Sequence, residues 1–428
     1  MQTLQDKRGA EEAAVRGPVS EGHEKFPSNV PTRLTPLNVA LLTGGQDRHY
    51  AVGLATALME QDVHLEVIGS DEVDGPEFQG NPRVRFCNLH GSQTTASLAR
   101  RVERIVFFYA RLIHYAATAK PRIFHILWNN KLPVFDRTLL MLIYKLLGKK
   151  VLFTAHNVNA GRRDRKDSWL NRATLKFQYK LLDHLFVHTE KMKDELIGEF
   201  GVKAEKITII PYGVNNAVPF TELTREEARR KLGLRNDEKT ILFFGAIKQY
   251  KGLEYLVAAF QQIAAQGDYR LIIAGERKKG CEEYWRSIQQ TIDQHPTRDK
   301  ILQRIEFIPD IETETYFKAA DVAVLPYTEI FQSGILFLSY SFGLPVIATD
   351  VGSFADDVIE GRNGFICRPR DPDDLATALR QYFGSELYEN LNTRQQEIRD
   401  LVQTEHTWDP VGAITRNTYR QLLDSTGP

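Results

Sequence analysis

Short apolar runs rich in β-branched and aromatic residues alternate along this chain with longer segments of helical periodicity. In the first half, helices are expected at 50–59, 96–117, 137–147, 170–182 and 190–200, between strands at 38–42, 64–68, 84–86, 123–127, 151–154, 185–188 and 207–210. Strands that alternate with helices of at least about ten residues are typical of a parallel sheet covered on both faces. The sequence therefore predicts an α/β fold built on doubly wound parallel sheets.

The alternation begins again after a polar connection that runs from Pro211 to about Glu238. Further strands are expected at 240–244, 269–274, 305–308, 322–325, 346–348 and 365–367. We therefore expect two Rossmann-like domains, at 37–212 and 213–405, that face each other across a cleft, with ligands at the carboxyl ends of the strands. Residues 1–36 are expected to be a disordered polar tail, and 406–428 a helix that crosses back to the first domain.

Composition excludes some classes of partner. The 428 residues include 55 basic and 55 acidic ones, so the basic excess of a protein that coats nucleic acid is missing. Three dispersed cysteines (Cys87, Cys281 and Cys367) form neither a disulfide framework nor a metal knuckle, which favours a cytoplasmic location. No run reaches the ~18 apolar residues of a membrane span. The nearest, Leu139–Leu147, is expected to be a buried helix, with peripheral contact at the inner face of the membrane as the alternative.

The loop 245–252 (GAIKQYKG) follows an expected strand and is the first candidate binding site. Gly245 lets the backbone approach a bulky ligand, the next helix starts with free amides, and Lys248 and Lys251 supply positive charge. This combination suits a diphosphate. An ordinary strand-to-helix turn with solvated lysines is the alternative.

Three further segments lie at expected strand ends. Ser333 and Gly334 begin an almost wholly apolar helix, whose rigid amides favour an anion, although Ser333 alone is also a good N-cap. His156 follows the strand at 151–154 and is expected to face the crevice, unless local backbone satisfies its ring. Gly44 and Gly45 lack the GxGxxG spacing of a dinucleotide site, which disfavours a nicotinamide enzyme. P-loop, HExxH, GxSxG and DxD signatures are missing as well, so no metal site is expected.

Several of these segments together resemble a known family. FFGAIKQYKGLEYLVAAF, ADVAVLPY, QSG, SFGLPVIATDVGS and GRNGF, in that order, resemble the second domain of GT-B glycosyltransferases of family 4. TGGQDRHYAVGLATAL, HILW, FTAHNVNAGRRD and VHTEKMKDELIGEF resemble the first domain of a bacterial branch that contains QSG. The resemblance implies a retaining hexosyltransferase that uses a nucleoside-diphosphate sugar as co-substrate and needs no other cofactor and no metal. It also implies a saccharide or lipid-linked acceptor, within polysaccharide or glycoconjugate assembly.

The resemblance implies roles for individual residues. His156 would face the reacting sugar, Lys251 would act on the leaving diphosphate, and Gly44 and Gly45 would approach the donor from across the cleft. The donor diphosphate and ribose would be held by Gly245, Lys248, Lys251, Gln332, Ser333, Gly334, Ile335 and Leu336, and the base would be lined by Phe307, Ile308, Pro309 and Asp310.

One departure from the family leaves a second function open. Many members carry an E-x7-E pair of glutamates, and here Ile330 and Leu338 occupy those positions, with Glu329 adjacent but out of register. A non-catalytic GT-B binding or scaffold subunit is therefore the alternative to an enzyme. The base, the sugar and the acceptor are not specified by these motifs.

Overall fold

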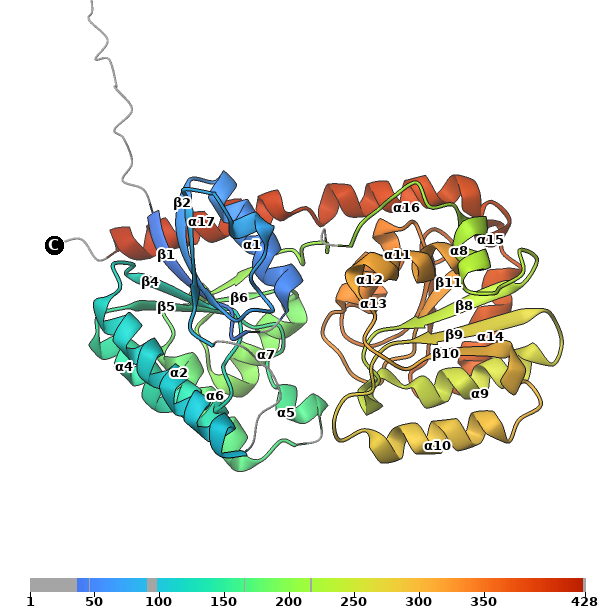
Figure 1. Cartoon of the computed structure of the whole chain (residues 1–428), viewed down its shortest axis with the longest axis horizontal. Coiled ribbons are helices and arrows are strands. Elements are labelled where there is room, and N and C mark those ends of the chain that lie inside the picture. The colour runs from blue at the N-terminus through green and yellow to red at the C-terminus, as the bar shows by residue number, and fades with distance from the viewer. Residues whose placement is uncertain (1–36, 46, 91–97, 165, 216–217, 426–428) are drawn as a thin grey trace, which may run out of the picture. The chain divides into compact units, whose positions relative to one another are not determined.

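The computed structural model describes residues 37–45, 47–90, 98–164, 166–215 and 218–425 (Figure 1). The expected tail at 1–36 lies outside these residues. The first sheet has seven parallel strands in the order β3-β2-β1-β4-β5-β6-β7. Its strands are β1 Leu37–Leu42, β2 Val63–Gly69, β3 Val84–Asn88, β4 Ile123–Ile126, β5 Lys150–Thr154, β6 His184–Val187 and β7 Ile207–Ile209.

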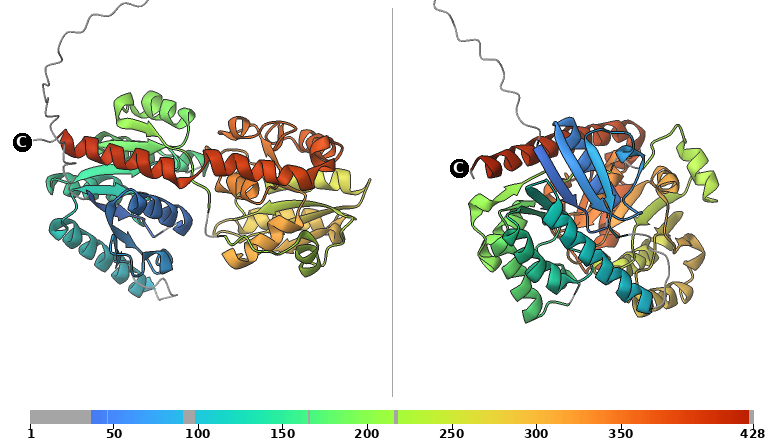
Figure 2. Two further views of the ribbon diagram at one scale, coloured as in Figure 1. Left: turned by 90° about the horizontal axis from the view of Figure 1, so that it is seen from above. Right: turned by 60° about the vertical axis from the view of Figure 1, so that its left-hand side comes forward.

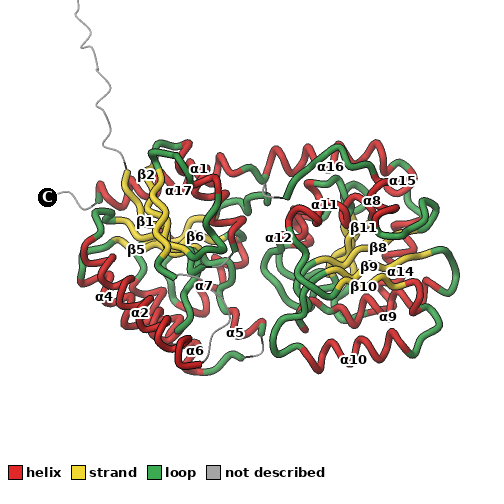
Figure 3. The backbone as a smooth tube through the Cα atoms, in the orientation of Figure 1, coloured by secondary structure: helices red, strands yellow, loops and turns green. Residues whose placement is uncertain are grey.

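Helices cover both faces of this sheet, and since successive side chains of a strand point to opposite faces, each strand contributes to two cores. In β1, Val39 and Leu41 join one core, and Ala40 and Leu42 join the other. Helices α1 and α17 cover the first face, while α2, α4, α6 and α7 cover the second (Figures 1 and 3). Their bounds are α1 Arg48–Glu60, α2 Leu98–Thr118, α4 Met141–Leu146, α6 Trp169–Leu181, α7 Glu190–Phe200 and α17 Trp408–Asp424, with short segments at η1 Pro76–Phe78, α3 Pro133–Phe135, η2 Asp136–Leu140, α5 Ala160–Arg163 and η3 Ala204–Lys206.

The second sheet has six parallel strands in the order β10-β9-β8-β11-β12-β13. The strands are β8 Lys239–Phe244, β9 Tyr269–Ala274, β10 Ile301–Arg304, β11 Val322–Leu325, β12 Val346–Thr349 and β13 Gly364–Cys367. The helical segments are α8 Arg225–Lys231, η4 Gln249–Lys251, α9 Leu253–Ala264, α10 Glu282–Asp293, η5 Arg298–Lys300, α11 Asp310–Ala319, α12 Gly334–Ser341, α13 Phe354–Asp357, α14 Pro372–Phe383, α15 Glu386–Glu389 and α16 Leu391–Glu405. Two parallel sheets with helices on both faces confirm the predicted fold class.

One predicted strand was wrong. The expected strand at 305–308 is irregular, and the strand that pairs with β9 is β10, four residues earlier. β10 lies at the edge of the sheet, where hydrogen bonds to a single neighbour fix the register. Phe307 lies outside the strand and is 69% exposed, whereas Ile308 is buried, so the apolar run at 305–308 belongs to a loop that packs in part on the core.

The helix predicted at Leu139–Leu147 is present, but only one side of it is buried. Met141 and Tyr144 are buried, but Leu139, Leu142, Leu146 and Leu147 are exposed, with Leu146 at 85%. Near it, Tyr109 of α2 donates a hydrogen bond to Asp136 of η2 (2.9 Å), which connects the two segments. No helix in the described part of the chain is long and apolar enough to cross a membrane.

The last two helices connect the domains. α16 packs on α12 of the second domain, and α17 packs on α1 of the first (Figure 2). Trp408, the first residue of α17, lies so close to the backbone of Gly53 and Gly213 that an added Cβ on either would come within 2.3 Å of the indole. The Trp408 indole N–H also donates to the Val214 carbonyl (2.8 Å), so this residue ties the connection at 213–214 to α17.

Candidate active site

A cavity of about 340 Å³ is lined by residues that follow the carboxyl ends of strands in both sheets. This is where doubly wound sheets hold ligands. Its first-domain residues include Asp47, His49, Tyr50, Trp128, His156, Arg163 and His188, and its second-domain residues include Tyr250, Lys251, Tyr327, Ile330, Gln332, Ser333, Gly334, Ile335 and Leu338. Tyr212, Gly213 and Asn215, from the connection between the sheets, and Trp408 complete the lining.

Lys251 and the start of α12 meet on the second-domain side. Gly245, at a φ of +103°, lies directly behind the lysine, since an added Cβ would be 3.0 Å from Lys251 Nζ and 3.6 Å from Ile335. Ser333 is the N-cap of α12, and its hydroxyl accepts a hydrogen bond from the Ile335 amide (3.3 Å). The first amides of a helix lack intrahelical acceptors and carry the positive end of its dipole, so this corner of the cavity favours an anion.

Two cations lie in this part of the cavity. Lys251 is buried with its Nζ 5.2 Å from the centre of the Tyr327 ring, and burial lowers the pKa of its ammonium group, with a further lowering from Arg163. The Arg163 guanidinium stacks 4.6 Å from the centre of the Tyr250 ring and pairs with Asp164 (2.8 Å). A bound anion would offset the mutual repulsion of the two cations.

His156 is held on the first-domain side by aromatic rings. Its imidazole stacks on Trp128 (4.2 Å between centroids, 5° between planes), and Tyr50 contacts it edge-on at 4.3 Å. Its Nδ1 is 3.3 Å from Nε2 of His188, whose own Nδ1 is 3.2 Å from the Ile210 carbonyl. His156 Nε2 is buried and has no hydrogen-bond partner among the described residues. A clamped ring with one unsatisfied nitrogen is suited to contact a ligand.

Both imidazoles are neutral near neutral pH. Burial lowers the pKa of His188 to about 4, and burial together with the neighbouring His188 and His125 lowers the pKa of His156 well below its usual range. Lys251 and Arg163, rather than His156 or His188, therefore supply positive charge to the cavity.

Only some of the residues predicted to contact the donor line the cavity. His156, Lys251, Gln332, Ser333, Gly334 and Ile335 line the cavity together. Gly245 lies behind Lys251, and Leu336 is fully buried in the core beneath the helix. Gln332 presents a buried side-chain oxygen without a partner among the described residues.

The other predicted residues lie elsewhere. Gly44 packs on the Trp128 backbone, where a Cβ would come within 2.7 Å of its carbonyl oxygen, and Gly45 packs near Ser70. Lys248 lines an adjoining basic pocket of about 250 Å³ that shares Arg163 and Tyr250 with the cavity. Phe307, Ile308, Pro309 and Asp310 lie at the start of α11 outside the cavity lining, with Asp310 3.3 Å from His49.

The two positions of the expected glutamate pair are apolar walls. Ile330 and Leu338 both line the cavity, and Glu329 lies 3.7 Å from Arg162 outside it. Among the described residues that line the cavity, Asp47 is the one with an acidic side chain.

Sequence reasoning missed the aromatic side of the cavity. Trp128 follows β4 after one residue and His188 follows β6 directly, so the rule that selected His156 would have found them. Tyr50 in α1, Arg163 in α5 and Tyr212 carry no comparable signal, because they reach the cavity only through the packing of the domains.

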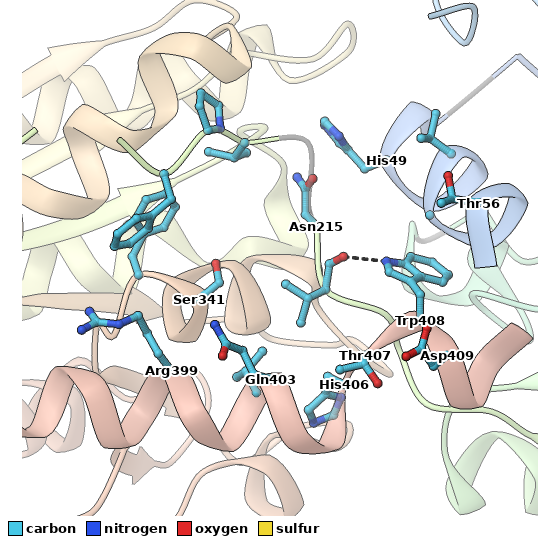
Figure 4. Close-up of a pocket in the computed structure, with 18 of the residues that line it drawn as sticks. His49, Thr56, Asn215, Ser341, Arg399, Gln403, His406, Thr407, Trp408 and Asp409 are labelled. Carbon is cyan, nitrogen blue, oxygen red and sulfur yellow. Dashed lines mark hydrogen bonds between the residues drawn. The ribbon is translucent and has the colours of Figure 1, made fainter. Parts of the chain in front are cut away.

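A larger cavity of about 950 Å³ contains none of the predicted residues. His49, Asn215 and Trp408 line both cavities, and Arg399 and Gln403 of α16 belong to the larger one (Figure 4). Among the residues that the structure describes, no group of three or more His, Cys, Asp or Glu side chains is arranged to hold a metal ion.

Comparison with known proteins assigns the family of both domains. Residues 43–218 match the family described as Glycosyltransferase Family 4, and residues 238–384 match Glycosyl transferases group 1. The chain is 30% identical over 246 residues to a D-inositol 3-phosphate glycosyltransferase of Paenarthrobacter aurescens, which covers 56% of this chain and 57% of that protein. It is 26% identical over 246 residues to an uncharacterized glycosyltransferase of Methanocaldococcus jannaschii, covering 56% and 60%. The chain thus matches less than two thirds of the length of these relatives.

Solved structures support the fold. A sucrose-phosphate synthase of Thermosynechococcus elongatus superposes with a TM-score of 0.73 at 21% identity, covering 91% of this chain and 100% of that one. HepE of Anabaena, solved in complex with UDP and glucose, superposes with a TM-score of 0.70 at 16% identity, covering 90% and 100%. With its two matched domains and its two doubly wound sheets, the chain belongs to the GT-B glycosyltransferases of family 4.

Proposed function

We propose that this protein transfers a sugar, with retention of anomeric configuration, from a nucleoside-diphosphate sugar to a saccharide or glycolipid acceptor. The setting would be polysaccharide or glycoconjugate assembly. The observation that carries the proposal is the meeting in one cavity of a buried lysine, a helix start and a neutral imidazole with a free nitrogen. The glycosyltransferase names of the relatives support it.

The lysine corner would bind the diphosphate of the donor. Lys251 and the first amides of α12 would stabilise the growing negative charge on the departing phosphate. Arg163 would reach the same group from the first domain. In HepE, UDP and glucose are held by a protein of the same fold, which supports a nucleotide-sugar donor here.

The transfer step would exchange one bond to the anomeric carbon for another. The bond from this carbon to the phosphate oxygen breaks, and a bond to the acceptor oxygen forms on the same face. The acceptor proton passes to the departing phosphate oxygen. The apolar side chains of Ile330 and Leu338 offer no carboxylate at the positions of the glutamate pair, and Asp47 is the acidic side chain left in the lining. The direct exchange on one face is proposed as a step that needs no carboxylate.

The cations of the protein would replace a metal ion. Lys251 and Arg163 both line the cavity, and their charges would neutralise a bound diphosphate without a divalent cation. We therefore expect transfer to continue in the presence of EDTA.

A lipid-linked acceptor would bring the first domain to the inner face of a membrane. Val102, Val106 and Phe107 of α2 are exposed beside Arg100 and Arg111. Exposed apolar side chains next to basic ones suit the headgroup region of an anionic bilayer. Cosedimentation with vesicles that contain phosphatidylglycerol, compared with phosphatidylcholine vesicles, tests this contact.

A second candidate is a non-catalytic subunit that binds a nucleotide sugar. The replacement of the glutamate pair by Ile330 and Leu338 favours it. The buried cation beside α12 suits either candidate, because both bind a diphosphate, so release of nucleotide from the donor is what separates them.

A two-step experiment tests the proposal. Thermal shifts against UDP, GDP, ADP and their glucose or mannose derivatives identify the donor, since a ligand at 100 times its Kd stabilises by about 2.7 kcal/mol. The selected donor is then incubated with membrane extract, and the anomeric form of the product is read by NMR. An inverted product contradicts retention, and donor binding without release of nucleotide supports the scaffold.

A further inference from the structure

The two histidines of the cavity form a chain whose proton positions follow from their partners. His188 Nδ1 lies 3.2 Å from the Ile210 carbonyl oxygen. A carbonyl oxygen can only accept, so His188 Nδ1 carries the proton and donates. Because a neutral imidazole has one N–H, His188 Nε2 then has a lone pair and accepts.

The contact between the two rings then determines which nitrogen of His156 carries the proton. His188 Nε2 is 3.3 Å from His156 Nδ1, and two lone pairs at this distance would repel. His156 Nδ1 therefore carries the proton of the neutral ring, and His156 Nε2 is left with a lone pair. That nitrogen is the buried one without a partner among the described residues, on a residue that lines the cavity.

The surroundings hold both rings in this arrangement. His188 is buried, and Trp128 and Tyr50 fix the plane of the His156 ring. Burial lowers the pKa of both imidazoles, so neither gains a second proton near neutral pH. A phosphate oxygen has no proton to donate at this pH, so it cannot satisfy the lone pair of His156 Nε2, whereas a sugar hydroxyl can.

We propose that His188 is a positioning residue that keeps His156 in its Nδ1–H tautomer, so that His156 Nε2 accepts a hydrogen bond from a substrate hydroxyl. This inference rests on the proposed function, because it names the group that meets His156 in that same site. The hydroxyl belongs either to the donor sugar or to the acceptor. A ring with the proton on Nε2 would instead select an acceptor group such as a phosphate oxygen.

Proton–nitrogen correlation spectra of protein with isotope-labelled histidine test the tautomer directly. The signals of His156 are assigned by their loss in His156→Gln. In the wild type we expect a protonated Nδ1 and an unprotonated Nε2. His188→Phe keeps an aromatic ring but removes the acceptor, and should shift His156 toward the Nε2–H tautomer. His188→Gln is the matched control, because its side-chain oxygen accepts from His156 Nδ1 and should preserve the wild-type tautomer.

Activity and binding supply the second readout. His188→Phe should lower kcat about tenfold, the effect of one lost hydrogen bond in the reacting complex, while the Kd for UDP or GDP stays within about twofold. His188→Gln should recover most of this loss. For His156→Ala, weaker binding of UDP-glucose than of UDP, relative to wild type, assigns the hydroxyl to the donor, and a raised acceptor KM alone assigns it to the acceptor.

Two results overturn the inference: an Nε2–H tautomer of His156 in the wild type, or a tautomer unchanged in His188→Phe. If His188→Phe does not fold, His188→Leu removes the same acceptor with a smaller apolar side chain, and an unchanged tautomer in that variant overturns the inference equally. A protein that shows the expected tautomer but transfers no sugar contradicts the proposed function instead, so the two failures are distinct.

Discussion

Lys251 is the residue whose removal most directly tests the phosphate site. Its ammonium group is buried beside the start of α12. Lys251→Met removes the charge but keeps an unbranched apolar side chain of similar length, so it opens no large cavity. Losing a charge-assisted hydrogen bond should weaken UDP or GDP binding by about 1.5–3 kcal/mol, or roughly 10- to 150-fold, and leave uridine or guanosine binding unchanged. Calorimetric titration of both ligands measures this, with the exposed Lys231→Met as control. Equal losses for diphosphate and nucleoside would move the phosphate site elsewhere.

His156 should separate rate from nucleotide affinity. It lies on the first domain, opposite the lysine corner, so its contact with the substrate is made in the complex that reacts. His156→Ala should lower kcat at least about tenfold, with the Kd for the nucleoside diphosphate within about twofold. The melting temperature is measured on the same variant, because the stacking of His156 on Trp128 also supports the loop that follows β5. Full activity with unchanged stability would remove His156 from the site.

At the scale of elements, Gly252 shows how a turn positions the lysine. It joins η4 to α9 with a φ of +63°, and an added Cβ would lie 2.0 Å from the Pro326 carbonyl oxygen. Gly252→Ala should destabilise the protein by about 2–5 kcal/mol, the sum of backbone strain and overpacking. Gly233→Ala is the matched control, because its φ is +71° with no atom within 4 Å, and should cost only the strain, about 1–2 kcal/mol. Urea unfolding of both variants is the measurement, and equal losses would show that the contact with Pro326 relaxes.

The elements also show what the sequence could predict. Strands such as β8 and β11 are buried on both faces, so their apolar runs mark them without ambiguity, and of the residues singled out after β8 Lys251 lines the cavity. The edge strand β10 was missed because 301–304 and 305–308 are both partly apolar, and only pairing with β9 chooses between them. Trp128 and His188 could have been found from the strand ends, but the rest of the aromatic side depends on contacts across the chain, such as Trp408 with the Val214 carbonyl, which no local pattern encodes.

At the scale of the whole molecule, α17 is tied to the first sheet by a buried polar chain. The Tyr419 hydroxyl is 2.6 Å from His125 Nδ1, and His125 Nε2 is 2.8 Å from the Thr154 hydroxyl. Tyr419→Phe leaves a buried ring nitrogen without its partner and should cost about 1–3 kcal/mol. Tyr255→Phe is the control, because that hydroxyl makes no hydrogen bond within the described residues. Urea unfolding reports the difference, and equal stability of the two variants would mean that His125 finds another partner.

Buried histidines should make the stability of the whole protein depend on pH. Burial lowers the pKa of His125 to about 3 and that of His184 and His188 to about 4, against an ordinary value of 6.5. As the pH falls below about 6.5 the unfolded chain binds protons that the folded protein does not, so the free energy of unfolding falls until about pH 4. Each such group contributes a slope of up to about 1.4 kcal/mol per pH unit in this window. Asp136 opposes part of this slope, because burial raises its pKa to about 6 and the folded state binds its proton first.

His125→Gln should therefore lower the slope of the unfolding free energy against pH by up to the contribution of one proton. The amide of the new side chain can still bond Tyr419 or Thr154, and urea unfolding at pH 7, 6 and 5 measures the slope. Parallel profiles for the variant and the wild type would mean that His125 is already protonated in the fold.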